Sequence, residues 1–127
     1  MNPTVNGADG EADDRRTGPG ETSVAISTFP LGRWLVGRSG YGAMQLAGPN
    51  AFGEPADRAS AIGVLQAPVA SGVNHIDTAQ YYGPDVVNEL IREALHPYPR
   101  GLAIVSKVAV RRDDSGAVLP FDDPSQL

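Results

Sequence analysis

An aspartate, a tyrosine and a lysine are the residues of this chain whose types and spacing suit acid–base chemistry. Asp77 ends the apolar segment V-N-H-I-D, Tyr82 follows after one short loop, and Lys107 ends the run L-A-I-V-S-K. A nearby ammonium group stabilises a phenolate, so a tyrosine beside a lysine can donate a proton near neutral pH. A carboxylate partner keeps such a lysine charged in a partly desolvated pocket. Together the three side chains would form a proton donor.

Each of these residues also has an interpretation without chemistry. Asp77 could cap a turn, Tyr82 could pack in a core, and Lys107 could reach solvent from the end of a strand. Function is favoured for Lys107 because it is the one lysine in a chain with nine arginines. We interpret His75 as a hydrogen-bonded interior residue, because it precedes the end of its strand, and His96 as the end of a helix.

The elements that must position these residues alternate between strands and helices. Two β-like runs around a Pro/Gly turn predict a hairpin from Ser23 to Gly37. Apolar spacing, capping residues and turn residues then predict, in chain order, a strand at 41–46, a helix between Asp57 and Gly72, a strand at 73–78, a helix between Gly83 and His96, and a strand at 102–108.

The predicted strands imply where individual side chains lie. Alternation in strand 73–78 puts His75 and Asp77 on one face. The near-continuous apolar run 102–108 is typical of a strand buried on both faces, with Lys107 at its carboxyl end. From Arg111 onward we expect a polar loop, followed by the first turn of a third helix at 122–124.

Composition limits the classes of function. At 127 residues and 41% hydrophobic content the chain suits one domain, which we place at 23–127 behind a disordered acidic tail at 1–22. It has no cysteine and no histidine cluster, so we expect no metal site. A net charge of −5 argues against nucleic acid as a partner, and no apolar run is long enough to span a membrane. We therefore expect a cytoplasmic protein.

A repeated strand–helix–strand order predicts a parallel sheet with its chemical groups at the carboxyl ends of the strands. Both a doubly wound sheet and a (β/α)8 barrel have this order. The doubly wound class is disfavoured because Gly40-Tyr41-Gly42 lacks the third glycine of a dinucleotide-binding loop. The segment 37–40 also misses the spacing of a G-x-S-x-G nucleophile turn. Candidate groups at the ends of separate strands favour the barrel.

Three segments resemble the N-terminal part of the aldo-keto reductase family. They are G-Y-G-A-M-Q-L-A-G, then G-V-N-H-I-D-T-A-Q-Y-Y-G-P with the following Asn88-Glu89, and A-I-V-S-K. The resemblance covers Ser23 to Leu127. It implies an α/β fold, namely the N-terminal portion of a (β/α)8 TIM barrel closed below by an N-terminal β-hairpin, with about three β/α units present.

The same resemblance implies an oxidoreductase that transfers hydride between NADPH and a small-molecule carbonyl substrate. Its general acid would be Tyr82 rather than Tyr81, because Tyr82 directly precedes the turn glycine. Asp77 and Lys107 would assist it. Ala43 and Met44, together with Asp77, would approach the nicotinamide end of the cofactor. The choice between NADPH and NADH stays open.

The chain departs from that family in length, because a (β/α)8 barrel needs roughly 250 residues. The family's catalytic histidine and its phosphate-binding loops come from later strands and have no counterpart here. We therefore expect a reductase domain truncated at its C-terminus and inactive by itself. The alternatives are a non-catalytic interaction module, or one half of a split barrel that a complementing chain completes.

Overall fold

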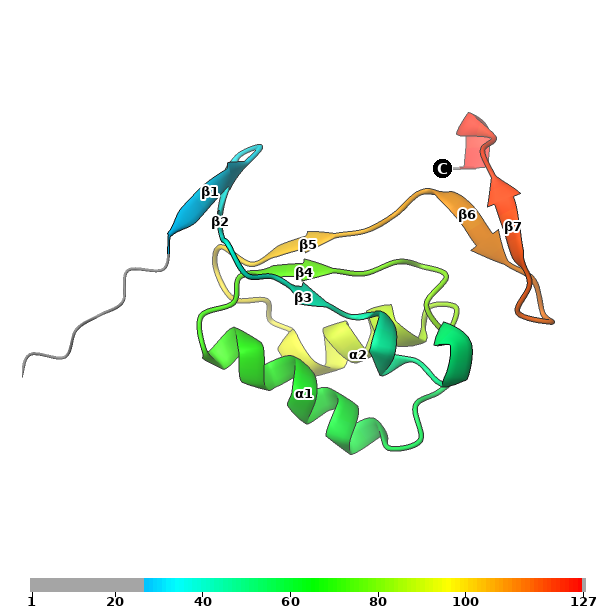
Figure 1. Ribbon diagram of the computed structural model, residues 1–127, viewed down its shortest axis with the longest axis horizontal. Coiled ribbons are helices and arrows are strands. Elements are labelled where there is room, and N and C mark those ends of the chain that lie inside the picture. The colour runs from blue at the N-terminus through cyan, green and yellow to red at the C-terminus, as the bar shows by residue number, and fades with distance from the viewer. Residues whose placement is uncertain (1–26, 127) are drawn as a thin grey trace, which may run out of the picture.

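The computed structural model describes residues 27–126, which form a small parallel sheet, two helices and two flanking hairpins (Figure 1). The predicted tail at 1–22 and the first residues of the predicted hairpin lie outside the described residues. The strands are β1 (Thr28–Leu31), β2 (Trp34–Gly37), β3 (Tyr41–Gly42), β4 (His75–Asp77), β5 (Ala103–Val105), β6 (Ala109–Arg112) and β7 (Val118–Phe121). The helices are α1 (Arg58–Ala70) and α2 (Val86–Leu95), and the 3₁₀ turns are η1 (Met44–Leu46), η2 (Pro49–Ala51) and η3 (Pro124–Gln126).

The central sheet consists of the parallel strands β3, β4 and β5 in sequential order. Helices α1 and α2, which connect them, lie on the same face of this sheet (Figure 1). A doubly wound sheet carries helices on both faces, whereas a (β/α)8 barrel carries them only on the outside. The arrangement is therefore that of a partial barrel, with one covered face and one open face.

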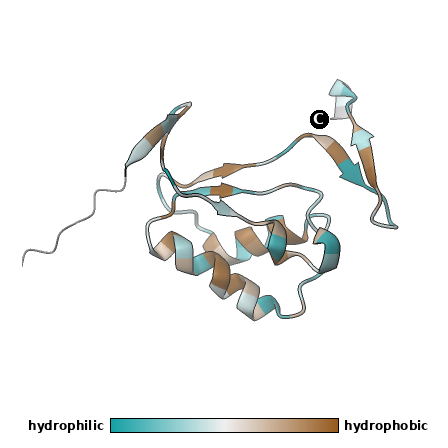
Figure 2. Ribbon diagram, viewed as in Figure 1, coloured by the Kyte–Doolittle hydropathy of each residue, from teal (hydrophilic) through white to brown (hydrophobic). Residues whose placement is uncertain are grey.

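The hydrophobic core lies between the sheet and the two helices. Leu65 of α1, Ile76 of β4 and Leu90 of α2 are fully buried there. Figure 2 shows hydrophobic residues along both helices and in β4 and β5. The side chain of Asp57 caps α1 by accepting a hydrogen bond from the backbone nitrogen of Ser60 at 3.0 Å, as its sequence position predicts.

The described part of the predicted hairpin is β1–β2, and it lies at the amino end of β4, where the family resemblance implies a hairpin. Asn74, just before β4, attaches it to the sheet through two hydrogen bonds. Its Oδ1 accepts from the backbone nitrogen of Gly37 at 2.8 Å, and its Nδ2 donates to the carbonyl of Leu35 at 2.8 Å. One amide side chain therefore satisfies two backbone groups where the antiparallel hairpin meets the parallel sheet.

The prediction of a strand at 41–46 is wrong after its first two residues. Strand β3 ends at Gly42, and η1 follows as a 3₁₀ turn. The backbone nitrogen of Ala43 still donates to the carbonyl of Asp77 at 2.9 Å, but that of Leu46 turns back to the carbonyl of Ala43 at 3.0 Å. Ala43 and Leu46 are both buried in the core, so burying these apolar side chains takes the chain away from the sheet.

The expectation for 102–108 as a strand buried on both faces is also wrong. Strand β5 is only three residues long, and Ile104 and Val105 are 39% and 36% exposed. The physical reason is that the helices cover one face of the sheet, and among the described residues β5 pairs on one side only.

The polar loop expected from Arg111 is instead an antiparallel hairpin of β6 and β7. The predicted third helix appears only as the 3₁₀ turn η3 within the described residues. These residues therefore contain three parallel strands and two of the three helices that three β/α units require. None of the described helices has the length and apolar character that crossing a membrane requires.

Replacing Leu65 with alanine should lower the free energy of unfolding by about 2–5 kcal/mol, because it leaves a cavity between α1 and the sheet. The side chain of Leu65 is 0% exposed. The matched control is Val64→Ala one residue earlier, where the side chain is 50% exposed and the expected change is within about 0.5 kcal/mol. Denaturant unfolding followed by circular dichroism measures both, and equal losses for the two variants would contradict this core.

Candidate active site

The carboxyl end of the sheet brings Asp77 and Lys107 together. Asp77 ends β4 and is paired in register with Gly42 of β3 and Val105 of β5. Register partners in a parallel sheet share a face, and Lys107 follows Val105 by two residues, so both side chains lie on the open face. The Nζ atom of Lys107 lies 2.7 Å from Oδ2 of Asp77, an ion pair with both side chains partly exposed.

Tyr82 lies beside this ion pair in the loop between β4 and α2. It is only 6% exposed, and its ring centroid lies 5.0 Å from Nζ of Lys107. Gly83, which follows it, has φ +87°, and a Cβ there would lie 2.6 Å from Cβ of Val86. The turn therefore requires glycine at the position after the tyrosine. The neighbouring Tyr81 packs edge-on against Tyr82, with ring centroids 5.2 Å apart.

The electrostatic environment keeps Lys107 protonated. Partial burial lowers the pKa of Lys107, but the hydrogen bond to Asp77 and the nearby hydroxyl of Tyr82 together outweigh it, so the pKa is raised above the ordinary lysine value. A charged ammonium group thus lies between a carboxylate and a phenol. This is the charge arrangement that stabilises a phenolate.

The backbone of Thr78 also binds the ammonium group, and the side chain of Thr78 is bonded in turn to Asn88; the sequence analysis predicted neither contact. Nζ of Lys107 also donates to the backbone carbonyl of Thr78 at 3.0 Å. The Thr78 side chain is 2% exposed, and its hydroxyl bonds to Oδ1 of Asn88 at 3.0 Å. The signal was present in the sequence, because a threonine directly after Asp77 and an asparagine ten residues later both lie in the segment that resembles the family.

The two residues predicted to approach the cofactor have different exposures. Ala43 is 0% exposed as a whole residue, so neither its side chain nor its backbone reaches the surface here, whereas Met44 is 44% exposed. Between β3 and Asp77 the surface is open, because no atom lies within 4 Å of the position a Cβ would take on Gly42. The sheet is therefore uncovered at Gly42, the register partner of Asp77.

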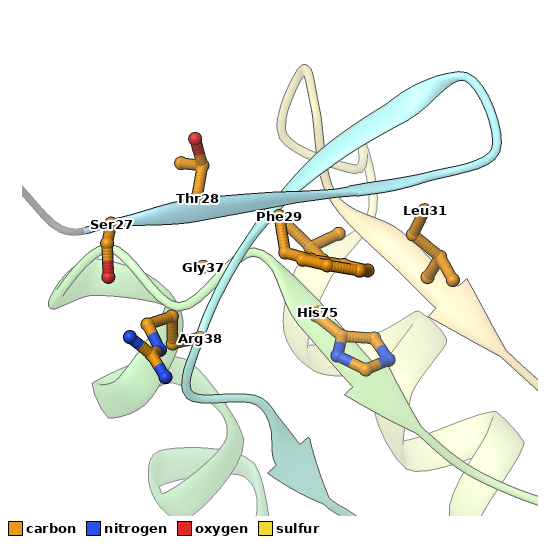
Figure 3. Close-up of a pocket in the computed structure, with 8 residues that line it drawn as sticks. Ser27, Thr28, Phe29, Leu31, Gly37, Arg38 and His75 are labelled. Carbon is orange, nitrogen blue, oxygen red and sulfur yellow. The ribbon is translucent and has the colours of Figure 1, made fainter.

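Neither histidine lies at the carboxyl end of a strand, because His75 begins β4 and His96 follows α2. His75 lines a cavity of about 560 Å³ under the β1–β2 hairpin together with Phe29, Leu31 and Val36. Figure 3 shows His75, Phe29 and Leu31 around this space, and His75 is the first residue of β4, whose last residue is Asp77. Within residues 27–126 the His75 ring makes no hydrogen bond, so its predicted partner is not found there. His96 caps the end of α2 and is exposed, as predicted.

A second cavity, of about 490 Å³, opens at the carboxyl end of the sheet. Met44, Gln45, Asn50, Ala51 and Arg112 line it. It is smaller than the cavity at His75. Because Met44 follows the end of β3, this cavity lies on the side of the sheet where the candidate acid–base groups lie. Among residues 27–126 no group of three histidine, aspartate or glutamate side chains is arranged to hold a metal ion.

The pKa of Lys107 is directly measurable because this is the chain's one lysine. In a ¹⁵N-lysine-labelled chain, an NMR titration should give a Nζ midpoint above that of a free lysine side chain. Asp77→Asn should lower the midpoint, since it removes the hydrogen-bonded carboxylate. Asp114→Asn, at an exposed aspartate, is the control that should leave it unchanged. A midpoint unmoved by Asp77→Asn would contradict the ion pair.

Because the pKa of Lys107 is raised on folding, the free energy of unfolding should fall at high pH. The folded state holds the Lys107 proton more tightly than the unfolded chain does, where lysine titrates near about 10.4. The ion pair therefore contributes its full stability below about pH 10.4 and loses it as pH rises through the folded-state pKa.

Comparison with known proteins places these elements in a family. The sequence model described as the aldo/keto reductase family matches residues 39–120. Pyridoxine 4-dehydrogenase of Escherichia coli is 54% identical over 104 residues, which cover 82% of this chain and 36% of that protein. An uncharacterized oxidoreductase of Schizosaccharomyces pombe is 42% identical over 100 residues, covering 79% of this chain and 32% of that protein.

A solved structure shows the same fold. The glycerol dehydrogenase of Gluconobacter oxydans superposes with a TM-score of 0.65 at 23% identity, over 80% of this chain and 32% of that one. The chain thus spans about a third of the length of the curated relatives it matches. The family match includes strand β4 with Asp77, the loop that carries Tyr82, and Lys107, which follows β5 by two residues. This chain belongs to the aldo/keto reductase family.

Proposed function

We propose that this chain supplies the proton-donating half of an NADPH-dependent carbonyl reductase site. Tyr82 is the general acid, Lys107 favours its ionised form, and Asp77 holds Lys107 in place and charged. The observation that supports this most directly is the 2.7 Å ion pair of Lys107 and Asp77, with Nζ 5.0 Å from the centroid of the Tyr82 ring. A lysine serving only as a solvated surface charge would not need a buried tyrosine and a carboxylate beside it.

In this reaction the carbonyl carbon gains a hydride and the carbonyl oxygen gains a proton, which yields an alcohol. NADPH, when bound, supplies the hydride. Tyr82 gives its phenol proton to the substrate oxygen, and Lys107 stabilises the phenolate that remains. The open surface beside Gly42 and the exposed Met44 suit a flat nicotinamide ring, with Asp77 at its edge.

For the substrate we propose the class named for the relative with 54% identity, which is a pyridoxine 4-dehydrogenase. Dehydrogenation of an alcohol and reduction of the matching aldehyde are the two directions of one reaction. Pyridoxine and its 4-aldehyde are therefore the first pair to test with this chain.

The open face of the sheet supports a site that further strands complete. Asp77 and Lys107 lie on that face and keep 47% and 34% of their side-chain surface exposed. Exposed Val105 continues the same face as an uncovered apolar surface. We therefore assign the hydride-transfer activity to an assembly in which a complementing polypeptide covers this face, and we expect the 127-residue chain alone to be inactive.

A complementation experiment tests this function. The chain is co-expressed with the part of E. coli pyridoxine 4-dehydrogenase outside its aligned 104 residues. We expect NADPH binding, measured by fluorescence titration, and pyridoxal-dependent NADPH oxidation in the complex but not with either part alone. Saturable binding and turnover by the chain alone would show that the site needs no complement. No turnover in any form would reject the reductase assignment.

Tyr82→Phe should abolish most of this turnover, by about 10²-fold or more, because it removes the proton donor and keeps the ring. Tyr81→Phe is the matched control, since the neighbouring tyrosine packs against the same ring. It should change the rate by less than about threefold. A larger loss in Tyr81→Phe than in Tyr82→Phe would reverse the assignment of the acid.

A further inference from the structure

Arg112, in a segment that the sequence predicts only as polar loop, makes three hydrogen bonds to three separate loops. Its Nε donates to the carbonyl of Tyr81 at 3.1 Å, and its Nη2 donates to the carbonyl of Asn50 at 2.9 Å. Its Nη1 donates to the carbonyl of Gly116, in the turn of its own hairpin, at 2.8 Å. Figure 1 shows this hairpin beyond the end of the sheet where β4 and β5 finish.

One bond from Arg112 holds the loop of Tyr82 on one side, and a backbone bond from Gly83 holds it on the other. The residue before Tyr82 accepts from Arg112, which also binds Asn50. The residue after Tyr82, Gly83, donates its backbone N–H to the carbonyl of Ala51 at 3.0 Å. Tyr82 is therefore attached on both sides to the same two-residue segment, Asn50–Ala51.

That segment has an unfavourable backbone conformation. Asn50 and Ala51 have φ angles of +60° and +55°, in the left-handed region that residues with a Cβ rarely adopt. Asparagine tolerates this region better than alanine does. Such a conformation persists only when its surroundings hold it, and strained residues of this kind gather at functional sites. Here the bonds from Arg112 and Gly83 to the two carbonyls are the contacts that hold it.

Among the described residues, the guanidinium group of Arg112 donates its hydrogen bonds only to the carbonyls of these loops. Within residues 27–126 no carboxylate forms an ion pair with its guanidinium. The group instead lies 5.9 Å from the ring centroid of Phe52, and a Cβ on Gly116 would lie 3.3 Å from the same ring. A planar fork with several N–H groups reaches carbonyls in different directions, which a single ammonium group cannot do.

From this arrangement we infer that Arg112 is a positioning residue for Tyr82. It ties the tyrosine loop, the strained Asn50–Ala51 segment and the β6–β7 hairpin into one unit, and thereby sets the tyrosine ring against Lys107. The inference rests on the proposed role of Tyr82 as acid. The placement of the Tyr82 ring by Arg112, however, can be tested without measuring turnover.

The first test is spectroscopic and uses the 127-residue chain. In Arg112→Gln, hydrogen exchange at the Gly83 amide should be faster by about tenfold or more, because the segment that accepts its bond is released. The ring-current shift of the ε-methylene protons of Lys107, the chain's one lysine, should shrink as the Tyr82 ring moves. The Thr78 amide, bonded to the carbonyl of Val105 at 2.8 Å, should keep its exchange rate.

Arg111→Gln is the matched control, because it removes the same charge from the neighbouring position. Arg111 is exposed and lies over the ring of Phe121, away from the tyrosine loop. This variant should leave both signals unchanged. Unchanged signals in Arg112→Gln, or equal changes in both variants, would overturn the inference. So would equal acceleration at Gly83 and Thr78, which would make Arg112 a general stabilising residue.

The second test measures turnover in the complemented assembly. Arg112→Gln should lower kcat by about 10- to 100-fold, because a small displacement of a catalytic group is costly, with little change in the KM for NADPH. Arg112→Lys keeps the charge but cannot span three carbonyls, so it should fail to restore kcat. Full rescue by lysine would overturn the positioning role. If no variant, wild type included, reduces a carbonyl, the proposed function fails while the spectroscopic test still decides the role of Arg112.

Discussion

Strand β4 pairs with a parallel strand on each side, and this pairing determines where the other elements lie. Parallel neighbours require crossover connections, which are α1 and α2 here, and both lie on one face. The register that aligns Gly42, Asp77 and Val105 brings three strand ends to one edge. An acid and a base far apart in sequence therefore meet without long loops. The Lys107–Asp77 bond joins residues 30 positions apart.

The covered and the open face of the sheet have different chemistry. Ile76 points to the helices and is fully buried, while its neighbours His75 and Asp77 point the other way and are half-buried. The helix side provides the stability of the fold, since it excludes water from a continuous apolar cluster. The open side keeps its polar groups in reach of a ligand or a further layer.

Loops at the carboxyl end set the position of the tyrosine more than the strands do. Tyr82 belongs to no strand or helix, and its neighbours in sequence are attached to Asn50, Ala51 and, through Arg112, to the second hairpin. These contacts connect segments 31 and 62 residues apart. They are hydrogen bonds to backbone carbonyls, which every residue has, so no residue type in the tyrosine loop identifies Arg112 as its partner.

The sequence by itself determined the family, the described part of the first hairpin, the order of strands and helices from β3 to β5, and the choice of Asp77, Tyr82 and Lys107 as candidates. Period-two and three-to-four residue spacings, capping residues and local motifs carry that information, because they reflect contacts within one element. Only the tertiary structure decided that β3 stops at Gly42, that β5 has an exposed face, and that Arg112 joins three loops. Those outcomes depend on what packs against each segment from elsewhere in the chain, and a local pattern does not record its distant neighbours.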